Sequence, residues 1–349
     1  MFVVRPVTSA DIPALASLAA AATLGVHTLP RTPGTIARAV ERSLESFAAE
    51  VDVPGEESYL FVLESSADGA LLGCAAISAA AGANGTYFAF RNDVMQQVSR
   101  DLHISHSVHA LTLCSALTGY SQLSGFFVRG RGGETGGREA ALLSRARLLF
   151  AALAPQRFNA RFFAALAGVT DASGASPFWE ALGRKFFQMD FLEAERLIEG
   201  ARNRTLIIEL MPHYPVYAPI LPGPAQAAMG QVHAEGELPF QLLTEEGFEP
   251  DEFIDIFDGG PILQAHKHAL RSFNASFLRP VSDRLPPADP AADAEPPVAY
   301  LLAAARPDDF RAALFDCAPL EYASAVWLPP QLLERLQLAV GEAVLCVRL

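Results

Sequence analysis

The 349-residue sequence lacks the features that would place it in a membrane, outside the cell or on a nucleic acid. No apolar run approaches the roughly 20 residues of a membrane-spanning helix, and the N-terminus has no basic segment followed by an apolar one. Only 26 residues are basic against 39 acidic ones, and the formal net charge of -13 argues against a nucleic-acid surface. These absences predict a soluble, cytoplasmic protein with no nucleic-acid or membrane partner, and the charge suits a small cationic or zwitterionic ligand.

Cysteine is scarce as well. The four cysteines lie far apart in apolar segments and show no C-x-x-C spacing, which is typical of zinc sites and redox motifs. We expect reduced core residues at Cys74, Cys114, Cys317 and Cys346.

Three histidines are the candidates for a metal site. His103, His106 and His109 are spaced by three, so on a helix they could line one face as ligands. The flanking Ile104 and Val108 favour a strand instead, and a strand would divide the trio between its two faces. We therefore expect no bound metal.

Apolar residues are what the sequence has in plenty. With 51% hydrophobic and 19% charged residues, the chain can bury a large core, and its length suggests two or three structural units. We divide it into units at residues 1–200 and 201–284, a proline-rich linker at 285–297 and a small β-rich module at 298–349.

One glycine-rich stretch, residues 124–152, organises the first unit. It predicts an apolar strand at 124–128, a glycine turn, and a long helix from which Arg138, Arg145 and Arg147 can reach solvent. Backbone N–H groups of such a turn can face a phosphate. A flexible surface turn is the alternative reading.

Periodicity and capping residues predict the other elements. Strands are expected over residues 2–5, 58–65, 71–80, 161–167, 205–210, 253–257, 298–304, 310–315 and 342–349, and a further apolar stretch covers 108–117. Helices are expected over residues 9–22, 35–50, 176–187, 239–246 and 331–338. This mixture predicts an α/β (α+β) fold.

The order of these elements resembles the GNAT acyl-CoA N-acyltransferases. That superfamily ends in an aromatic-x-x-Leu-Gly-x-x-aromatic pattern, and residues 176–187, Ser-Pro-Phe-Trp-Glu-Ala-Leu-Gly-Arg-Lys-Phe-Phe, are similar. The resemblance implies a GNAT-like fold with the CoA pyrophosphate at the turn before the central helix. Residues 242–248 echo residues 181–183, which suggests two GNAT-like halves in tandem.

Five segments resemble one branch, the arginine N-succinyltransferases, and they span nearly the whole chain. They are Gly-Glu-Glu-Ser-Tyr at 55–59, Ser-Pro-Phe-Trp at 176–179, Glu-Leu-Met-Pro-His-Tyr-Pro at 209–215, Gly-Gln-Val-His at 230–233 and Ile-Asp-Ile-Phe-Asp-Gly-Gly-Pro at 254–261. Residues 25–30, 46–51, 90–92 and 211–215 are most similar to the alpha chain of the two-subunit arginine/ornithine form.

This resemblance implies an activity and its partners. Members of the family transfer succinyl from succinyl-CoA to the α-amino group of L-arginine, and in some cases L-ornithine, as the first step of arginine catabolism. Succinyl-CoA would be a co-substrate, with no permanently bound cofactor. A beta chain of the same enzyme would be the partner, with self-association as the alternative.

His233 is the candidate catalytic residue. Acyl transfer to an amine needs a proton for the leaving thiolate, and imidazole can donate or accept a proton near neutral pH. The family's proposed proton donor falls on the motif at 230–233 that His233 ends. A loop histidine that caps a helical turn is the alternative.

The resemblance also assigns the acyl-CoA contacts. The backbone of Phe126 and Val128 and the turn at Gly136, Gly137 and Arg138 would hold succinyl-CoA. Only the final small residue of the superfamily's turn pattern is present, so the turn departs from that pattern.

Other positions depart too. Ala165 and Ala167 stand where many relatives have a Glu-x-Arg pair, and Trp179 stands where several GNAT enzymes use an acid tyrosine. An indole donates a hydrogen bond but cannot shuttle a proton. The departures favour a non-catalytic or regulatory subunit that stabilises a competent beta chain, whereas His233 favours an enzyme.

The guanidinium group of arginine would be bound best by carboxylates in a bidentate pair. Glu209, Asp255 and Asp258 lie in or beside apolar, strand-like runs and are the candidates. Each could equally cap a turn or pair with a structural arginine.

Overall fold

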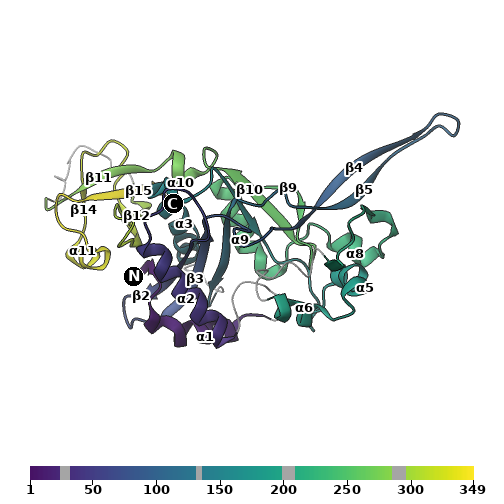
Figure 1. Cartoon of the computed structure of the whole chain (residues 1–349). Coiled ribbons are helices and arrows are strands. Elements are labelled where there is room, and N and C mark those ends of the chain that lie inside the picture. The colour runs from purple at the N-terminus through teal and green to yellow at the C-terminus, as the bar shows by residue number, and fades with distance from the viewer. Residues whose placement is uncertain (24–31, 131–135, 199–208, 285–295) are drawn as a thin grey trace.

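The computed structural model describes residues 1–23, 32–130, 136–198, 209–284 and 296–349. In this part of the chain, fifteen strands form one continuous sheet, and helices cover its faces (Figure 1). The mixed α/β class that the sequence predicts is confirmed.

The middle of the sheet holds, in spatial order, β1 (Phe2–Pro6), β2 (Ser58–Ser65), β3 (Leu71–Ser78), β6 (Ser121–Val128) and β7 (Arg161–Ala165). Neighbouring strands are antiparallel, except that β6 and β7 are parallel. A parallel pair needs a crossover connection, and helix α3 (Gly136–Leu153) provides it. The strands and the helix that we expected here are confirmed, with ends shifted by a few residues.

Helix α3 lies inside the main core. Both Arg145 and Arg147 are only 2% exposed, so the prediction that they reach solvent is wrong. The sheet covers one side of α3, and α9 (Glu237–Glu246) and α10 (Arg271–Asn274) contact it as well. A helix between two layers has no solvent face, and of the three arginines only Arg138, in its first turn, is exposed.

The opposite face of the central strands is covered by α1 (Ile12–Ala21), which follows a 3-10 turn, and α2 (Pro33–Ala48). Alternate residues of a strand point to opposite faces. Accordingly Val62 packs with these two helices, whereas its neighbours Phe61 and Leu63 pack in the α3 cluster.

Beyond β7 the sheet continues through β10 (Pro261–His266) and β9 (Glu249–Ile254), and the short β8 (Val216–Tyr217) forms one end. Small helices pack there: α4 (Pro177–Ala181), α5 (Gly183–Phe187), α6 (Phe191–Ile198) and α8 (Gly223–Ala228). The single helix expected over 176–187 is thus two helices, and the backbone at their junction, Leu182, has φ -121° and ψ -73°. The chain approaches so closely at Gly183 that a Cβ there would lie 2.2 Å from the Trp179 ring.

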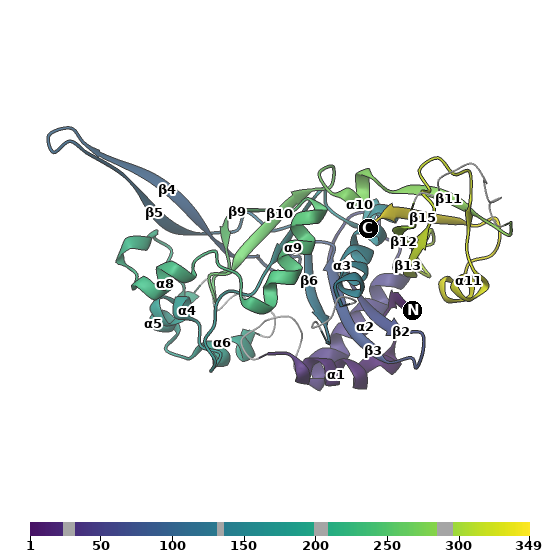
Figure 2. The ribbon, with the colours of Figure 1, turned by 180° about the vertical axis from the view of Figure 1, so that it is seen from behind.

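A long hairpin, β4 (Ala89–Ser99) and β5 (Ile104–Cys114), leaves the body of the protein (Figures 1 and 2). β4 pairs with β9 only through Phe90 and Arg91, and β5 pairs with β8 only through Ala110 and Leu111. Residues 92–109, which we call the arm, therefore form a ribbon of two strands that, in the described part of the chain, pair only with each other. The sequence did not predict β4.

The C-terminal strands extend the sheet at its other end, because β13 pairs with β1. The elements are β11 (Phe277–Ser282), β12 (Val298–Ala304), β13 (Ala312–Cys317), β14 (Val326–Trp327), α11 (Pro330–Leu336) and β15 (Ala343–Arg348). The full order is β14-β11-β15-β12-β13-β1-β2-β3-β6-β7-β10-β9-β4-β5-β8. β11 comes before the predicted linker, yet it pairs with β15 and β14 and so lies with the C-terminal strands.

Some expected elements fall partly outside the described residues. Of the strand expected over 205–210 only two residues are described, and they are helical. Of the expected linker, only residues 296 and 297 are described. No helix in the described ranges combines the length and apolarity that crossing a membrane requires.

Candidate active site

The first component is the place where the parallel strands β6 and β7 part. Their pairing runs from Ser121 opposite Phe162 to Leu123 opposite Ala164 and ends there. Just beyond it β6 carries a bulge, because its register with β3 shifts between Ala76–Ser124 and Cys74–Phe127. Gly125, at φ 61°, supplies the left-handed conformation that such a bulge needs.

Arg147 of α3 holds this bulge from inside the core. Its Nη1 donates to the carbonyl oxygens of Ala76 and Ser124, each at 3.3 Å, and its guanidinium lies over the Phe126 ring. Burial lowers the pKa of Arg147 to about 9. The thiol of Cys74 donates to the Gly125 carbonyl at 3.4 Å, and burial raises its pKa to about 12, so it stays protonated.

The predicted acyl-CoA contacts lie along this strand and at the start of α3. Phe126 and Val128 are buried in β6, so only their backbone could meet a ligand. Gly136 and Gly137 open α3, and a Cβ at Gly137 would have no atom within 4 Å among the described residues. Arg138 pairs with Asp316 of β13 at 2.6 Å, an exposed ion pair. Most of the glycine turn, residues 131–135, lies outside the described part of the chain.

His233 lies beside the chain segment that follows β7. Its N–H donates to the Ala167 carbonyl at 2.8 Å, and Val232 beside it forms an antiparallel bridge with Gly168. The half-buried ring caps a 3-10 turn (Ala234–Gly236), because Nδ1 accepts the N–H of Glu235 at 3.1 Å. Nδ1 is thus an acceptor, which leaves the ring proton of a neutral imidazole at Nε2.

Two of the three candidate carboxylates belong to one tight loop after β9. Asp258 is buried, and its two oxygens accept the N–H groups of Gly168 at 2.7 Å and Gly260 at 2.8 Å. Asp255 is half-buried and accepts the N–H of Phe257 at 2.8 Å.

The structure therefore joins His233 and Asp258 through Gly168. Glu209 is exposed at the edge of the described residues. The histidine trio is divided, as expected for a strand: His103 lies in the hairpin turn and His106 and His109 lie on β5. No group of three or more potential ligands that could hold a metal occurs among the described residues.

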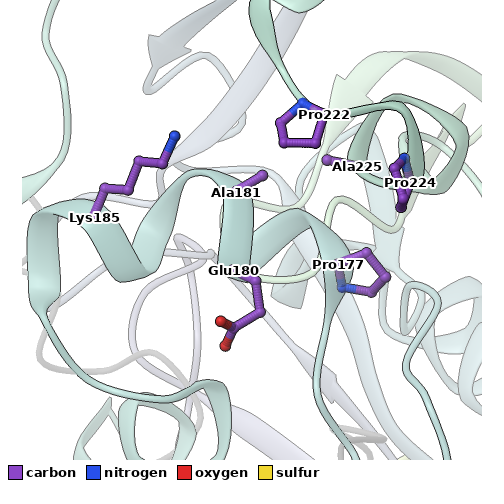
Figure 3. A pocket seen from close by; sticks show the side chains of 7 residues that line it. All are labelled: Pro177, Glu180, Ala181, Lys185, Pro222, Pro224 and Ala225. Carbon is purple, nitrogen blue, oxygen red and sulfur yellow. The ribbon is translucent and has the colours of Figure 1, made fainter.

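Two surface hollows lie elsewhere. One, of about 280 Å³, lies between α4, α5 and the start of α8 (Figure 3) and is lined by Pro177, Glu180, Ala181, Lys185, Pro222, Pro224 and Ala225. The other, of about 520 Å³, is lined by residues of β7, β9 and β10 and their loops. None of the predicted site residues lines either hollow. Trp179, near the first, donates its indole N–H to the Met189 carbonyl at 3.1 Å.

Sequence reasoning missed Gly125, Arg147 and Gly168. A lone glycine within an apolar strand is a signal for a bulge, and Gly125 carries it. Arg147 and Gly168 give no local signal, because their partners lie 23 to 90 residues away in the chain.

Comparisons with known proteins agree along the whole chain. The family model described as arginine N-succinyltransferase beta subunit matches residues 2–272, and that of its C-terminal domain matches residues 284–348. Arginine N-succinyltransferase subunit alpha of Pseudomonas aeruginosa is 44% identical over 316 residues, 90% of each chain. The arginine N-succinyltransferase of Salmonella newport is 36% identical over 349 residues, which is 100% of this chain and 98% of that protein.

A solved structure, that of arginine/ornithine succinyltransferase subunit AI from Pseudomonas aeruginosa, matches with a TM-score of 0.86 and 39% identity, covering 100% of this chain and 98% of the other. Sequence and fold thus agree, and the chain belongs to the arginine N-succinyltransferase family.

Proposed function

We propose that this chain is a succinyl-CoA-dependent acyltransferase subunit that transfers succinyl to the α-amino group of L-arginine. The observation that carries the proposal is the full-length family match, within which the motif ending in His233 is intact. L-Ornithine is the second acceptor to test, because the matching structure is that of an arginine/ornithine succinyltransferase subunit. The alpha type is favoured by the relative with 44% identity, although both family models carry the beta-subunit description.

The reaction requires no covalent bond between the protein and the substrates. The amine nitrogen attacks the thioester carbon, the C–S bond breaks, and one proton moves from nitrogen to sulfur. We assign this transfer to His233: its Nε2–H donates a proton to the leaving sulfur, and Nε2 then takes up the proton that the amine nitrogen loses, since Nδ1 already accepts the N–H of Glu235. Backbone N–H groups near the bulge of β6 would hold the thioester carbonyl, where charge develops.

A GNAT-like arrangement is part of the proposal. It is supported by the parallel pair β6 and β7, the crossover helix α3 between them, and the bulge at Gly125. Succinyl-CoA would lie along the backbone of Phe126 and Val128, and its pyrophosphate would meet the N–H groups of Gly136 and Gly137 at the N-terminus of α3. The tandem halves and the four-part domain division stay proposals.

Of the carboxylates, Asp255 and Glu209 remain the candidates for the guanidinium group. Both oxygens of Asp258 are engaged by backbone N–H groups. Buried polar groups are normally hydrogen-bonded in this way, and we assign Asp258 to anchoring the loop after β9.

A homologous subunit is the proposed partner, and the arm is the proposed contact. The arm exposes Val94, Val98, Leu102 and Ile104, and the chain at its base exposes Tyr214, Tyr217 and Ile220. An isolated two-stranded ribbon is marginal in water, so one this long is expected to be covered. One chain offers both an apolar arm and an apolar base beside it, so two related chains can contact reciprocally about a two-fold axis.

A non-catalytic subunit is the second candidate. Arg138 is engaged by Asp316, and the Oε2 atom of Glu139, in the same turn, is buried without a hydrogen-bond donor among the described residues. A negatively charged carboxylate at this helix N-terminus would repel a pyrophosphate and weaken its binding.

One experiment separates the two candidates. The chain is purified alone and with a co-expressed beta-type chain, and CoA release from succinyl-CoA is measured with L-arginine and with L-ornithine. We expect acceptor-dependent CoA release that falls when only this chain carries His233→Asn. Release that is unchanged by that substitution would assign catalysis to the partner.

A further inference from the structure

We propose that Asp258 is a positioning residue for His233, acting through Gly168. The inference rests on the proposed function, in which His233 takes part in acyl transfer. Asp258 is 1% exposed, and its two oxygens accept backbone N–H groups, one of them that of Gly168. Through these bonds it acts on the backbone that carries His233.

The first link is the anchor. Oδ2 of Asp258 accepts the N–H of Gly168 at 2.7 Å, and Oδ1 accepts the N–H of Gly260 at 2.8 Å. One carboxylate thus joins the loop after β9 to the segment after β7, 90 residues earlier in the chain. Bonds from backbone N–H to a carboxylate are among the stronger hydrogen bonds in proteins, and burial shields them from water.

The second link runs from Gly168 to His233. Gly168 forms an antiparallel bridge with Val232, and the preceding carbonyl, of Ala167, accepts the N–H of His233 at 2.8 Å. The same segment is tied at its other end, because Gly230 donates its N–H to the carbonyl of Gly259 at 2.8 Å. Residues 230–233 are therefore held between the two chain segments that Asp258 joins, the one after β7 and the one after β9.

The backbone segments around Gly168, Gly259 and Gly260 are tightly packed. A Cβ at Gly168 would lie 2.6 Å from the Asp258 carbonyl oxygen, and one at Gly260 would lie 2.2 Å from the Leu166 carbonyl oxygen. Gly259 has φ 71° and lies against the Phe178 ring, where a Cβ would approach to 2.8 Å. Because these backbone segments are packed so closely, we expect a change at Asp258 to shift the backbone of residues 230–233 and with it the imidazole of His233.

The test is a double-mutant cycle in the assembled enzyme. Asp258→Asn keeps the shape of the side chain but turns one acceptor into an amide N–H group facing another N–H. We expect kcat to fall by about tenfold to a hundredfold, the range for a misplaced catalytic group, with KM for both substrates changed by less than about threefold. In the His233→Asn background the same change should cost less than about twofold.

A matched control is Asp171→Asn. Asp171 also accepts backbone N–H groups within a loop, those of Ser173 and Ala175, but it is exposed and its bonds stay within that loop. Its kcat should stay within about twofold of wild type. Melting curves of every variant show that the compared proteins are folded.

Each outcome is decisive. Losses that multiply in the Asp258→Asn, His233→Asn double variant overturn the positioning role, and so does a change confined to KM. If His233→Asn alone keeps normal turnover, the proposed role of His233 fails instead, whatever Asp258→Asn does.

Gly230→Ala provides the second variant if Asp258→Asn does not fold. A Cβ at residue 230 would have no atom within 4 Å among the described residues. The φ of 69° at this position strains an alanine, and we expect the strain to loosen the hydrogen bond from the N–H of residue 230 to the Gly259 carbonyl. It should lower kcat in the wild-type background and not in His233→Asn. Equal losses in both backgrounds would overturn the inference.

Discussion

His233 carries two roles in the structure, and they can be separated by substitution. As the cap of the turn at 234–236 it needs only an acceptor, whereas in acyl transfer it needs an imidazole. We predict that His233→Ala lowers kcat by roughly 10² to 10⁴ with a small change in KM. His233→Asn, which can still cap, should recover the melting temperature but not the activity.

The comparison of these two variants is informative because a cap alone would behave differently. Loss of a cap costs about 1 kcal/mol of stability and leaves turnover per folded molecule intact. The measurement is kcat in the assembled complex beside a melting curve for each variant. Normal turnover with asparagine would remove His233 from the mechanism.

The four cysteines should be unreactive in the native chain. All four are free, and burial raises the pKa of Cys74 and Cys346 to about 12 and that of Cys317 to about 11. Burial also raises the pKa of Cys114. Because the thiolate is the reactive form, these raised pKa values leave little of it near neutral pH.

We therefore predict slow labelling by a thiol reagent at pH 8 and a rate that climbs as the pH approaches 11, with half-buried Cys114 and Cys317 reacting before buried Cys74 and Cys346. In denaturant all four should react quickly. Cys114→Ser and Cys317→Ser together should remove the first phase. A fast phase in the native protein at pH 8 would show that one of these thiols is less buried than the structure has it.

At the scale of elements, sequence predicted best where one strand carries an apolar pattern of its own. The strands at 58–65 and 298–304 have the expected bounds. β4 was missed because polar residues such as Gln96 and Gln97 interrupt its apolar pattern, and the strand is held by its pairing with β5.

The site shows the same limit. His233 could be singled out from its motif, but its support could not, since Asp258 and Gly168 meet across 90 residues. The burial of Arg145 was missed for a related reason: periodicity finds one apolar face of α3, while the second layer comes from α9, about 90 residues later.

The N-terminus of α3 yields a prediction about the acyl donor. A side chain at Gly137 meets open space among the described residues, so substitution there leaves the backbone unstrained. Gly137→Asp places a negative charge in the first turn, which suits the helix dipole but repels a pyrophosphate. We predict at least about tenfold weaker CoA binding by isothermal titration, equivalent to about 1.4 kcal/mol.

Gly137→Ala is the matched control, with the same backbone effect and no charge, and it should bind CoA within about twofold of wild type. Arg138→Ala should have the smaller effect of a secondary contact, since Asp316 already engages Arg138. Equal affinity of the Asp and Ala variants would move the pyrophosphate away from this turn.

At the scale of the whole molecule, the arm and the C-terminal strands lie at opposite ends of one sheet. The arm holds Val98 at 66% and Leu102 at 69% exposure, and no third strand of the described residues pairs beside them. Two chains that each carry a net charge of -13 repel one another. A contact between related chains is therefore expected where charge is lowest, and the arm carries Asp93, Arg100 and Asp101 as its only charged residues besides histidine.

We predict that Val98→Asp with Leu102→Asp abolishes assembly while the subunit stays folded, because both side chains are exposed and neither supports the core. Light scattering at micromolar concentration should give a dimer or larger complex for the wild-type chain with its partner and a monomer for the variant. Tyr322→Asp, at 101% exposure between β13 and β14, is the control, and it should leave the mass unchanged. A wild-type mass in the arm variant would place the interface elsewhere, and a change in the Tyr322 variant would point to the C-terminal end of the sheet.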